Sequence, residues 1–131
     1  AVDAAGVHLG QTDLPCSEAR RILGAEKIIG VSAATPEEAA KAQSDGADYL
    51  GVGAVFATST KTNTRPVTAE TIRAIRSAVD IPFVVIGGVN SENISGLYGL
   101  GINGAAVISA IISQPDITAA ARKMRQAAER L

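Results

Sequence analysis

Short apolar runs alternate with longer amphipathic stretches along the whole chain. Each run is nearly continuous in apolar character, which is typical of a strand covered on both faces, and most are flanked by glycine, proline or acidic residues. The stretches between them carry apolar residues at helical spacing. This pattern predicts strands at residues 7–10, 28–32, 49–53, 83–86 and 105–108.

Helices are expected after these strands. Thr35 has the features of an N-cap, because Pro36 follows at the first helical position and Glu38 completes a capping box. Thr68 is the expected N-cap of a later helix, and the first helix carries Ile22 on its apolar face. The predicted helices cover residues 16–23, 36–44, 68–79, 92–99 and 117–130.

The alternation of strand and helix predicts a parallel sheet, because crossover connections are right-handed. Two of the strands end at residues 86–88 and 107–109 in glycine or serine, as the phosphate-binding seventh and eighth strands of a TIM barrel do. The strand at residues 7–10 would then be the fourth. We therefore predict an α/β fold of the parallel (β/α)8 TIM-barrel type, with residues 1–131 as a single domain that covers strands 4 to 8 and with strands 1 to 3 absent.

Composition narrows the class of protein. Of the 131 residues, 47% are hydrophobic and only 3% aromatic, so small aliphatic side chains must fill the core. A net charge of -1 argues against nucleic acid or a membrane surface as a partner. No apolar run approaches the roughly 18 residues of a membrane helix. A single cysteine, Cys16, fits a reducing compartment, and a cytoplasmic protein is expected.

The candidate chemistry centres on residues 51–61, where an apolar strand runs into a polar loop. Thr58, Ser59, Thr60 and Lys61 offer many hydrogen-bond donors and one positive charge. Ligands of α/β proteins bind at the carboxyl ends of parallel strands. This loop is therefore a candidate site for a phosphate, a pyrophosphate or a carboxylate.

Six motifs, in this order and spacing, resemble the thiamine phosphate synthase family. They are Gly-Val-His-Leu-Gly-Gln-Thr-Asp (6–13), Ile-Gly-Val-Ser (29–32), Gly-Ala-Asp-Tyr-Leu-Gly-Val-Gly (46–53), Thr-Ser-Thr-Lys (58–61), Ile-Gly-Gly-Val (86–89) and Val-Ile-Ser-Ala-Ile (107–111). The family is a TIM barrel of roughly 200 residues, so the chain resembles its C-terminal five βα units. The resemblance implies a transferase that joins hydroxymethylpyrimidine, from its pyrophosphate, to thiazole phosphate, with pyrophosphate as the second product and Mg²⁺ as cofactor.

The resemblance also implies roles for individual residues around the pyrophosphate. Asp13 would be one of two aspartates that bind the metal. Lys61 would bind the pyrophosphate that is released between the substrates, and Ser32 would also contact it. Both are therefore implied as catalytic residues.

A second group would bind thiazole phosphate. Thr58 and Thr60 would hold its phosphate or its ring substituents. Lys61, next to them, would bind the charge of the neighbouring pyrophosphate. Gly88, Ile108 and Ser109 would surround the phosphate through backbone N–H groups and one hydroxyl. Each role agrees with what the residue type can do chemically.

Several positions depart from the family's pattern. The second metal aspartate and the Gln, Arg and Lys set for the pyrimidine pyrophosphate belong to strands 2 and 3, so the chain alone is expected to be inactive. Ala54 and Ala57 replace prolines, and Thr68 stands where glycine is common. Ala34 replaces the histidine on which a related thiazole tautomerase relies. The alternatives are a phosphate-binding barrel module without transferase activity, a tautomerase-like relative, or a phosphate-binding barrel of amino-acid biosynthesis.

Simpler interpretations exist for single residues. Asp13 could cap the helix that begins near Cys16, and Ser32 could merely end a strand. His8, the only histidine, is expected to be a hydrogen-bonded core residue rather than a catalytic one. Cys16 could have a lowered pKa at a helix start, although a bystander thiol is the preferred interpretation. Lys61 could be a solvated loop lysine.

Five strands of an eight-stranded barrel leave two open sheet edges. Unpaired backbone groups at an edge are a template for further pairing. We therefore expect either self-association or an N-terminal half that covers these edges.

Overall fold

The computed structural model describes residues 3–56 and 66–131. Its strands form one five-stranded sheet in the order β1-β2-β3-β4-β5, and every neighbouring pair is parallel. The predicted parallel sheet is confirmed, with bounds that differ little for the first four strands. The strands are β1 (Gly6–Leu9), β2 (Ile28–Ala33), β3 (Tyr49–Gly53), β4 (Phe83–Ile86) and β5 (Gly104–Ala106).

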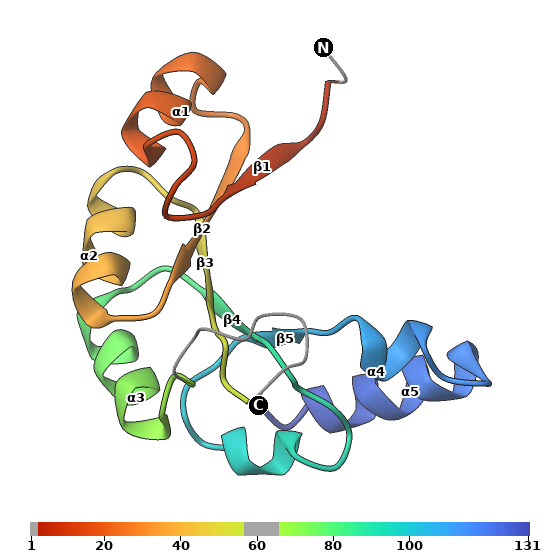
Figure 1. The fold of residues 1–131 in the computed structure, drawn as a ribbon. Helices are drawn as coiled ribbons and strands as arrows, with labels where there is room; N and C mark the ends of the chain where they lie inside the picture. The colour runs from red at the N-terminus through yellow and green to blue at the C-terminus, as the bar shows by residue number, and fades with distance from the viewer. Residues whose placement is uncertain (1–2, 57–65) are drawn as a thin grey trace.

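Helices alternate with the strands, and Figure 1 shows α1, α2 and α3 following one another along one side of the sheet. None of the helices within the described ranges has the length and apolar character needed to cross a membrane. The helical elements are α1 (Cys16–Leu23), α2 (Pro36–Ser44), α3 (Ala69–Ala78), the 3-10 helix η1 (Ile94–Leu97), α4 (Ser109–Ile112) and α5 (Ile117–Ala128).

The core lies between the sheet and these helices. Alternate strand positions point to opposite faces, and one set of positions is fully buried. Its largest member, Phe83, has 0% exposure. Apart from Ile28, the intervening positions of β2 and β3 are glycine, serine or tyrosine, and they form the opposite face of the sheet. The fully buried strand residues are Ile29, Leu50, Val52, Phe83 and Val85.

The predicted N-caps are confirmed, with one change in detail. The Thr35 hydroxyl accepts a hydrogen bond from the Glu38 N–H at 3.2 Å, and the Thr68 hydroxyl accepts one from the Thr71 N–H at 3.2 Å. The Glu38 carboxylate, however, accepts from the N–H of Ala34 at 2.7 Å rather than from that of Thr35. The reciprocal bond of the capping box therefore lies one residue earlier than predicted.

The helix predicted at residues 92–99 is wrong, because only η1 forms there. The Asn90 side chain accepts hydrogen bonds from the N–H groups of Glu92 and Asn93, at 2.9 and 3.1 Å, and so forms a turn in place of a first helical turn. Gly99 then adopts a φ of 74°, in the left-handed region that ends helices.

The last strand and the last helix are shorter than predicted. β5 ends at Ala106, whereas the apolar run continues to Ile108. Ile108 has φ -122° and ψ -80° and precedes α4, so the chain leaves the sheet before the run ends. α5 ends at Ala128, and Met124 is its buried residue as predicted.

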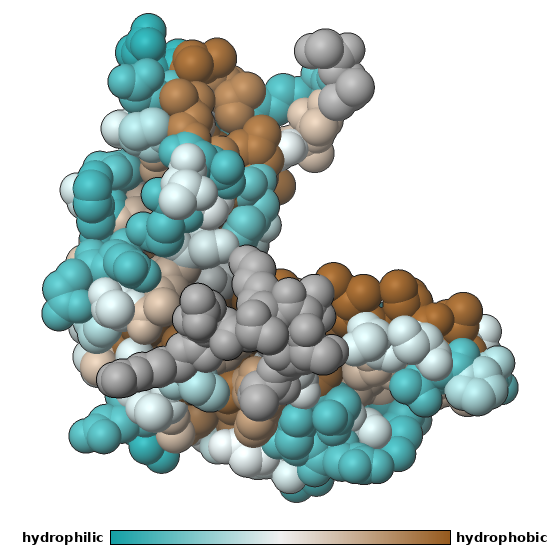
Figure 2. All heavy atoms as spheres, in the orientation of Figure 1, coloured by the Kyte–Doolittle hydropathy of each residue, from teal (hydrophilic) through white to brown (hydrophobic). Residues whose placement is uncertain are grey.

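Several large apolar side chains are exposed. Ile28 at the start of β2 and Ile112 on α4 are 51% and 62% exposed. Ile22, which the helical pattern placed on a buried face, is 63% exposed, because no element of the described chain covers that side of α1. Figure 2 shows hydrophobic residues gathered over the α1 end of the molecule and along α4.

Candidate functional site

The segments that follow the strands lie together, at the carboxyl ends of the strands. The strand register pairs Leu9 with Val31, Ser32 with Gly51, Gly53 with Ile86, and Ile86 with Ala106. Because all strands are parallel, their carboxyl ends lie together. The described residues that the sequence predicted for the site therefore lie at these carboxyl ends. They are Asp13, Ser32, Gly88, Ile108 and Ser109.

Asp13 is an exposed residue of the turn after β1. Its Oδ2 accepts a hydrogen bond from the N–H of Gly10 at 2.6 Å, and its own N–H donates to the Gly10 carbonyl at 3.2 Å. α1 begins after Pro15 without a side-chain cap, so the alternative in which Asp13 caps this helix is wrong. The carboxylate instead fixes the turn and keeps Oδ1 available.

Ser32 lies within β2 and is held by two side chains. Its hydroxyl is 3.0 Å from Nε2 of His8, and its carbonyl accepts a hydrogen bond from the Gln11 side chain at 2.6 Å. His8 also contacts the Tyr49 hydroxyl through Nδ1 at 2.9 Å. The expected hydrogen bonding of His8 is confirmed, but its assignment to the core is wrong, because the residue is exposed on the face opposite the helices.

Gln11 and Tyr49 were not predicted as site residues. Their partners are distant in the sequence, so no local pattern indicates them. A possible signal was the pair Gly30 and Gly51, each at the centre of a strand where a side chain is otherwise expected.

The loop after β4 exposes its backbone. Gly87 and Gly88 have φ values of 96° and 68°, a conformation that favours glycine, and a Cβ on Gly87 would lie 2.6 Å from the Cβ of Ala54. Asn93 donates to the Gly88 carbonyl at 2.8 Å and holds this turn. After the neighbouring strand β5, Ile108 is 66% exposed and Ser109 is exposed at the start of α4. Both turns can present N–H groups to an anion.

The polar loop after β3 is anchored beside the same turn. The N–H of Phe56 donates to the Gly87 carbonyl at 3.1 Å, and the N–H of Val67 donates to the Ala54 carbonyl at 2.7 Å. The residues before and after the loop thus lie next to the end of β4. The predicted site residues Thr58, Ser59, Thr60 and Lys61 lie outside the described residues.

Comparison with known proteins identifies the family. A family model described as thiamine monophosphate synthase matches residues 1–111. The chain belongs to this family. A solved thiamine phosphate pyrophosphorylase from Pyrococcus furiosus superimposes with a TM-score of 0.87 and 41% identity, over 98% of this chain and 61% of that one. The fold predicted from the sequence, a part of a thiamine phosphate synthase barrel, is therefore confirmed.

Curated thiamine phosphate synthases show the same relationship. The enzyme of Moorella thermoacetica is 53% identical over 131 residues, which are 99% of this chain and 62% of its own length. The enzyme of Ruminiclostridium cellulolyticum is 55% identical over 124 residues, 95% of this chain and 59% of its own length. The chain thus spans about 60% of these relatives and corresponds to their C-terminal portion.

Thiamine phosphate synthases use Mg²⁺, and the described residues fit this ion only in part. They contain no group of three His, Cys, Asp or Glu side chains that could hold a metal. Asp13 offers one carboxylate oxygen beyond its bond to Gly10. Mg²⁺ is commonly bound by one or two carboxylates together with water and substrate phosphates, so Asp13 suits one position of such a site.

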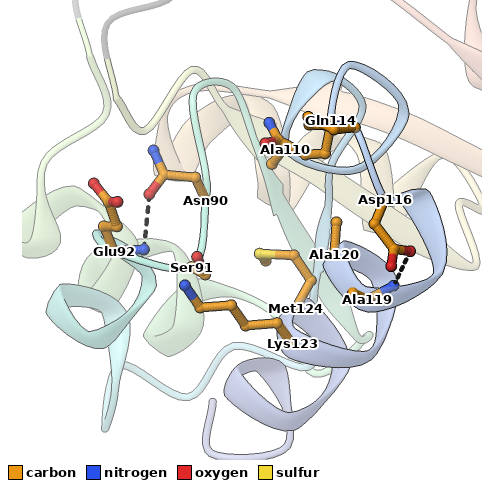
Figure 3. Close-up of a pocket in the computed structure, with 11 residues that line it drawn as sticks. Asn90, Ser91, Glu92, Ala110, Gln114, Asp116, Ala119, Ala120, Lys123 and Met124 are labelled. Carbon is orange, nitrogen blue, oxygen red and sulfur yellow. Dashed lines mark hydrogen bonds between the residues drawn. The ribbon is translucent and has the colours of Figure 1, made fainter.

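Two features were not among the predicted site residues: the buried Cys16 thiol and a cavity beside α5. Burial raises the pKa of the Cys16 thiol, with the Asp45 carboxylate acting in the same direction, which supports the bystander interpretation. A cavity of about 580 Å³ lies beside α5. Figure 3 shows Lys123 and Met124 of α5 pointing into it, opposite Asn90. None of the residues that the sequence predicted for the site lines this cavity.

Proposed function

We propose that the chain is the C-terminal part of a thiamine phosphate synthase. The reaction transfers hydroxymethylpyrimidine from its pyrophosphate to thiazole phosphate and gives thiamine phosphate and pyrophosphate. The proposal rests on groups that lie together at the carboxyl ends of the parallel strands. These are the exposed carboxylate of Asp13, the hydrogen-bonded hydroxyl of Ser32, and the turns at Gly88 and Ser109. Family membership supports the reaction class.

The chemistry needs stabilisation of a leaving anion. The bond between the pyrimidine methylene carbon and the pyrophosphate oxygen breaks, the pyrophosphate leaves with the electron pair, and the thiazole nitrogen attacks the resulting cation. Bound Mg²⁺ would supply positive charge against the pyrophosphate. Asp13 would hold the ion through its carboxylate, while Ser32 and Lys61 would bind the pyrophosphate oxygens.

Thiazole phosphate would occupy the neighbouring end of the sheet. The backbone at Gly88, Ile108 and Ser109 would bind its phosphate, since exposed N–H groups at such turns attract anions. Thr58 and Thr60 would bind the phosphate or the ring substituents. The anchors of their loop at Phe56 and Val67 adjoin the end of β4, which supports this assignment.

The remaining side of the active site would come from outside this chain. The unpaired outer strands β1 and β5, together with the exposed isoleucines on β2 and α4, fit a barrel in which three further βα units, or a second copy of the chain, pack against the sheet. The chain alone is then expected to lack transferase activity.

Complementation of a thiamine-requiring bacterium tests the function. The chain would be produced alone and joined behind the N-terminal part of the Moorella thermoacetica enzyme. We expect growth without thiamine only for the joined form, and loss of growth when it carries Lys61→Ala. The joined form with Lys123→Ala, which changes a lysine outside the proposed site, is the control and should still support growth.

Growth supported by the chain alone would contradict the proposal that the rest of the active site comes from outside this chain. Calorimetry of the joined form with thiazole phosphate and with inorganic pyrophosphate separates the synthase from a phosphate-binding module. A synthase binds both, whereas binding without product formation favours the module.

A further inference from the structure

His8 connects three strands on the face of the sheet opposite the helices. Its Nδ1 is 2.9 Å from the Tyr49 hydroxyl on β3, and its Nε2 is 3.0 Å from the Ser32 hydroxyl on β2. The centres of the His8 and Tyr49 rings lie 5.5 Å apart. Tyrosine, histidine and serine thus form one continuous hydrogen-bonded chain.

Two glycines make the space for these rings. A Cβ on Gly30 would lie 2.2 Å from Cζ of Tyr49 and 2.5 Å from Nδ1 of His8, so no other residue fits there without moving a ring. A Cβ on Gly51 would lie 3.0 Å from Cε1 of His8. The rings therefore lie directly against the backbone of the sheet, in space that larger side chains would fill.

The chemistry of the three groups favours one direction of donation. A neutral imidazole has one N–H donor and one lone pair, so the two hydroxyls compete for the lone pair. A phenol hydroxyl is more acidic than a serine hydroxyl, so Tyr49 is the stronger donor of the two. Tyr49 then donates to Nδ1, Nε2–H donates to Ser32, and the Ser32 proton stays available for a third group.

The main chain of Ser32 is held as well, because Gln11 donates to its carbonyl at 2.6 Å. We propose that Tyr49 and His8 act as a positioning relay that directs the Ser32 hydroxyl as a donor to an oxygen of the bound diphosphate. This inference rests on the proposed function, in which Ser32 contacts the pyrophosphate. His8 and Tyr49 are positioning residues that act through Ser32.

Calorimetry with inorganic pyrophosphate and Mg²⁺ tests the relay in the 131-residue chain. Tyr49→Phe keeps the ring and removes one hydroxyl, and we expect about fivefold weaker binding, the effect of one net hydrogen bond. Tyr98→Phe is the matched control. It removes a hydroxyl that donates to the Ala127 carbonyl at 3.0 Å, and it should leave the affinity unchanged.

Two further variants distinguish a relay from a structural role. His8→Gln should retain part of the affinity that His8→Ala loses, because an amide N–H can still donate to Ser32. In the Ser32→Ala background, Tyr49→Phe should cause no additional loss, because the relay acts only through the Ser32 hydroxyl. Additive losses would overturn the proposal.

Nitrogen NMR of the imidazole gives an independent measurement. His8 is the only histidine of the chain, so its ring signals need no assignment. We expect the proton on Nε2 and a shift of this nitrogen on addition of pyrophosphate. A proton on Nδ1, or ring signals that do not respond to pyrophosphate, would overturn the relay.

The two proposals fail in different ways. A joined barrel that forms no thiamine phosphate, while the His8 signals and the Tyr49→Phe affinity behave as expected, contradicts the proposed function alone. Unchanged affinity in Tyr49→Phe, in a barrel that makes thiamine phosphate, contradicts the relay alone.

Discussion

Asp48 connects the first three βα units at the amino ends of the strands, opposite the candidate site. Its carboxylate accepts hydrogen bonds from the N–H of Ile29 at 2.7 Å and from the Arg20 guanidinium at 2.6 Å. Arg20 also donates to the carbonyls of Gly46 and Lys27. The hydrogen bond from Ile29 is the largest cause that holds the pKa of Asp48 below its usual value, and Arg20 adds to it.

Asp48→Ala is expected to lower the free energy of unfolding by about 1 kcal/mol at pH 7, because the carboxylate is partly exposed. This contribution is present above the unfolded-state pKa of about 3.9 and is lost as the pH falls through the lower folded-state pKa. Urea unfolding at pH 7 and at pH 3 measures it. Asp80→Ala, at an exposed position, is the control, and a difference for Asp48→Ala that persisted undiminished at low pH would contradict the assignment.

The sequence predicted that His8 is hydrogen-bonded, but it could not predict the partners or the exposure. Tyr49 and Ser32 lie 41 and 24 residues away, and only the strand register brings them together. The contacts of Asp13 could not be predicted from the sequence either. Its bond to Gly10 is local, yet the choice between this turn and a helix cap depends on where α1 begins.

Elements with strong local signals formed where the sequence predicted them. α1, α2 and β3 have caps, glycine stops or continuous apolar runs at their ends, and these act within a few residues. η1 and β5 were mispredicted because their bounds depend on the Asn90 turn and on where the chain leaves the sheet at Ile108. Side-chain capping by Asn90 competes with the helix that hydrophobic spacing alone favours.

Thr68→Ala should lower the free energy of unfolding by about 1 kcal/mol, because it leaves the N–H of Thr71 without its capping acceptor. Thr68→Ser keeps the hydroxyl and should retain most of the stability. Denaturant titration followed by circular dichroism measures both. Ser77→Ala, in the same helix, should leave the stability nearly unchanged, and an equal loss for both alanine variants would argue against a capping role.

At the scale of the whole molecule, the barrel type and its order of strands followed from the sequence, because each βα unit is specified locally and parallel connections have one hand. The sequence did not indicate the cavity between the segment after β4 and α5, which depends on how η1 and α4 pack. It also placed Ile22 in a core, since a helical pattern cannot show whether its partner is present.

The exposed apolar side chains on β2 and α4 predict self-association of the isolated chain. Ile28→Lys with Ile112→Lys should shift sedimentation toward the monomer, because a charge at either exposed apolar position opposes its burial against a second copy. Ala40→Lys, on the exposed surface of α2, is the matched control and should not change the distribution. Monomeric behaviour of the unmodified chain at high concentration would contradict the prediction.

Because β1 to β5 follow one another in the sheet as they do in the sequence, every strand pairs only with the strands next to it in the chain. Each pairing therefore closes a short loop, and the entropy lost in bringing two strands together stays small and similar at every step. Folding can begin at any adjacent pair and extend outward in both directions. The order of assembly is then set by which unit is intrinsically most stable, rather than by which end of the chain leaves the ribosome first.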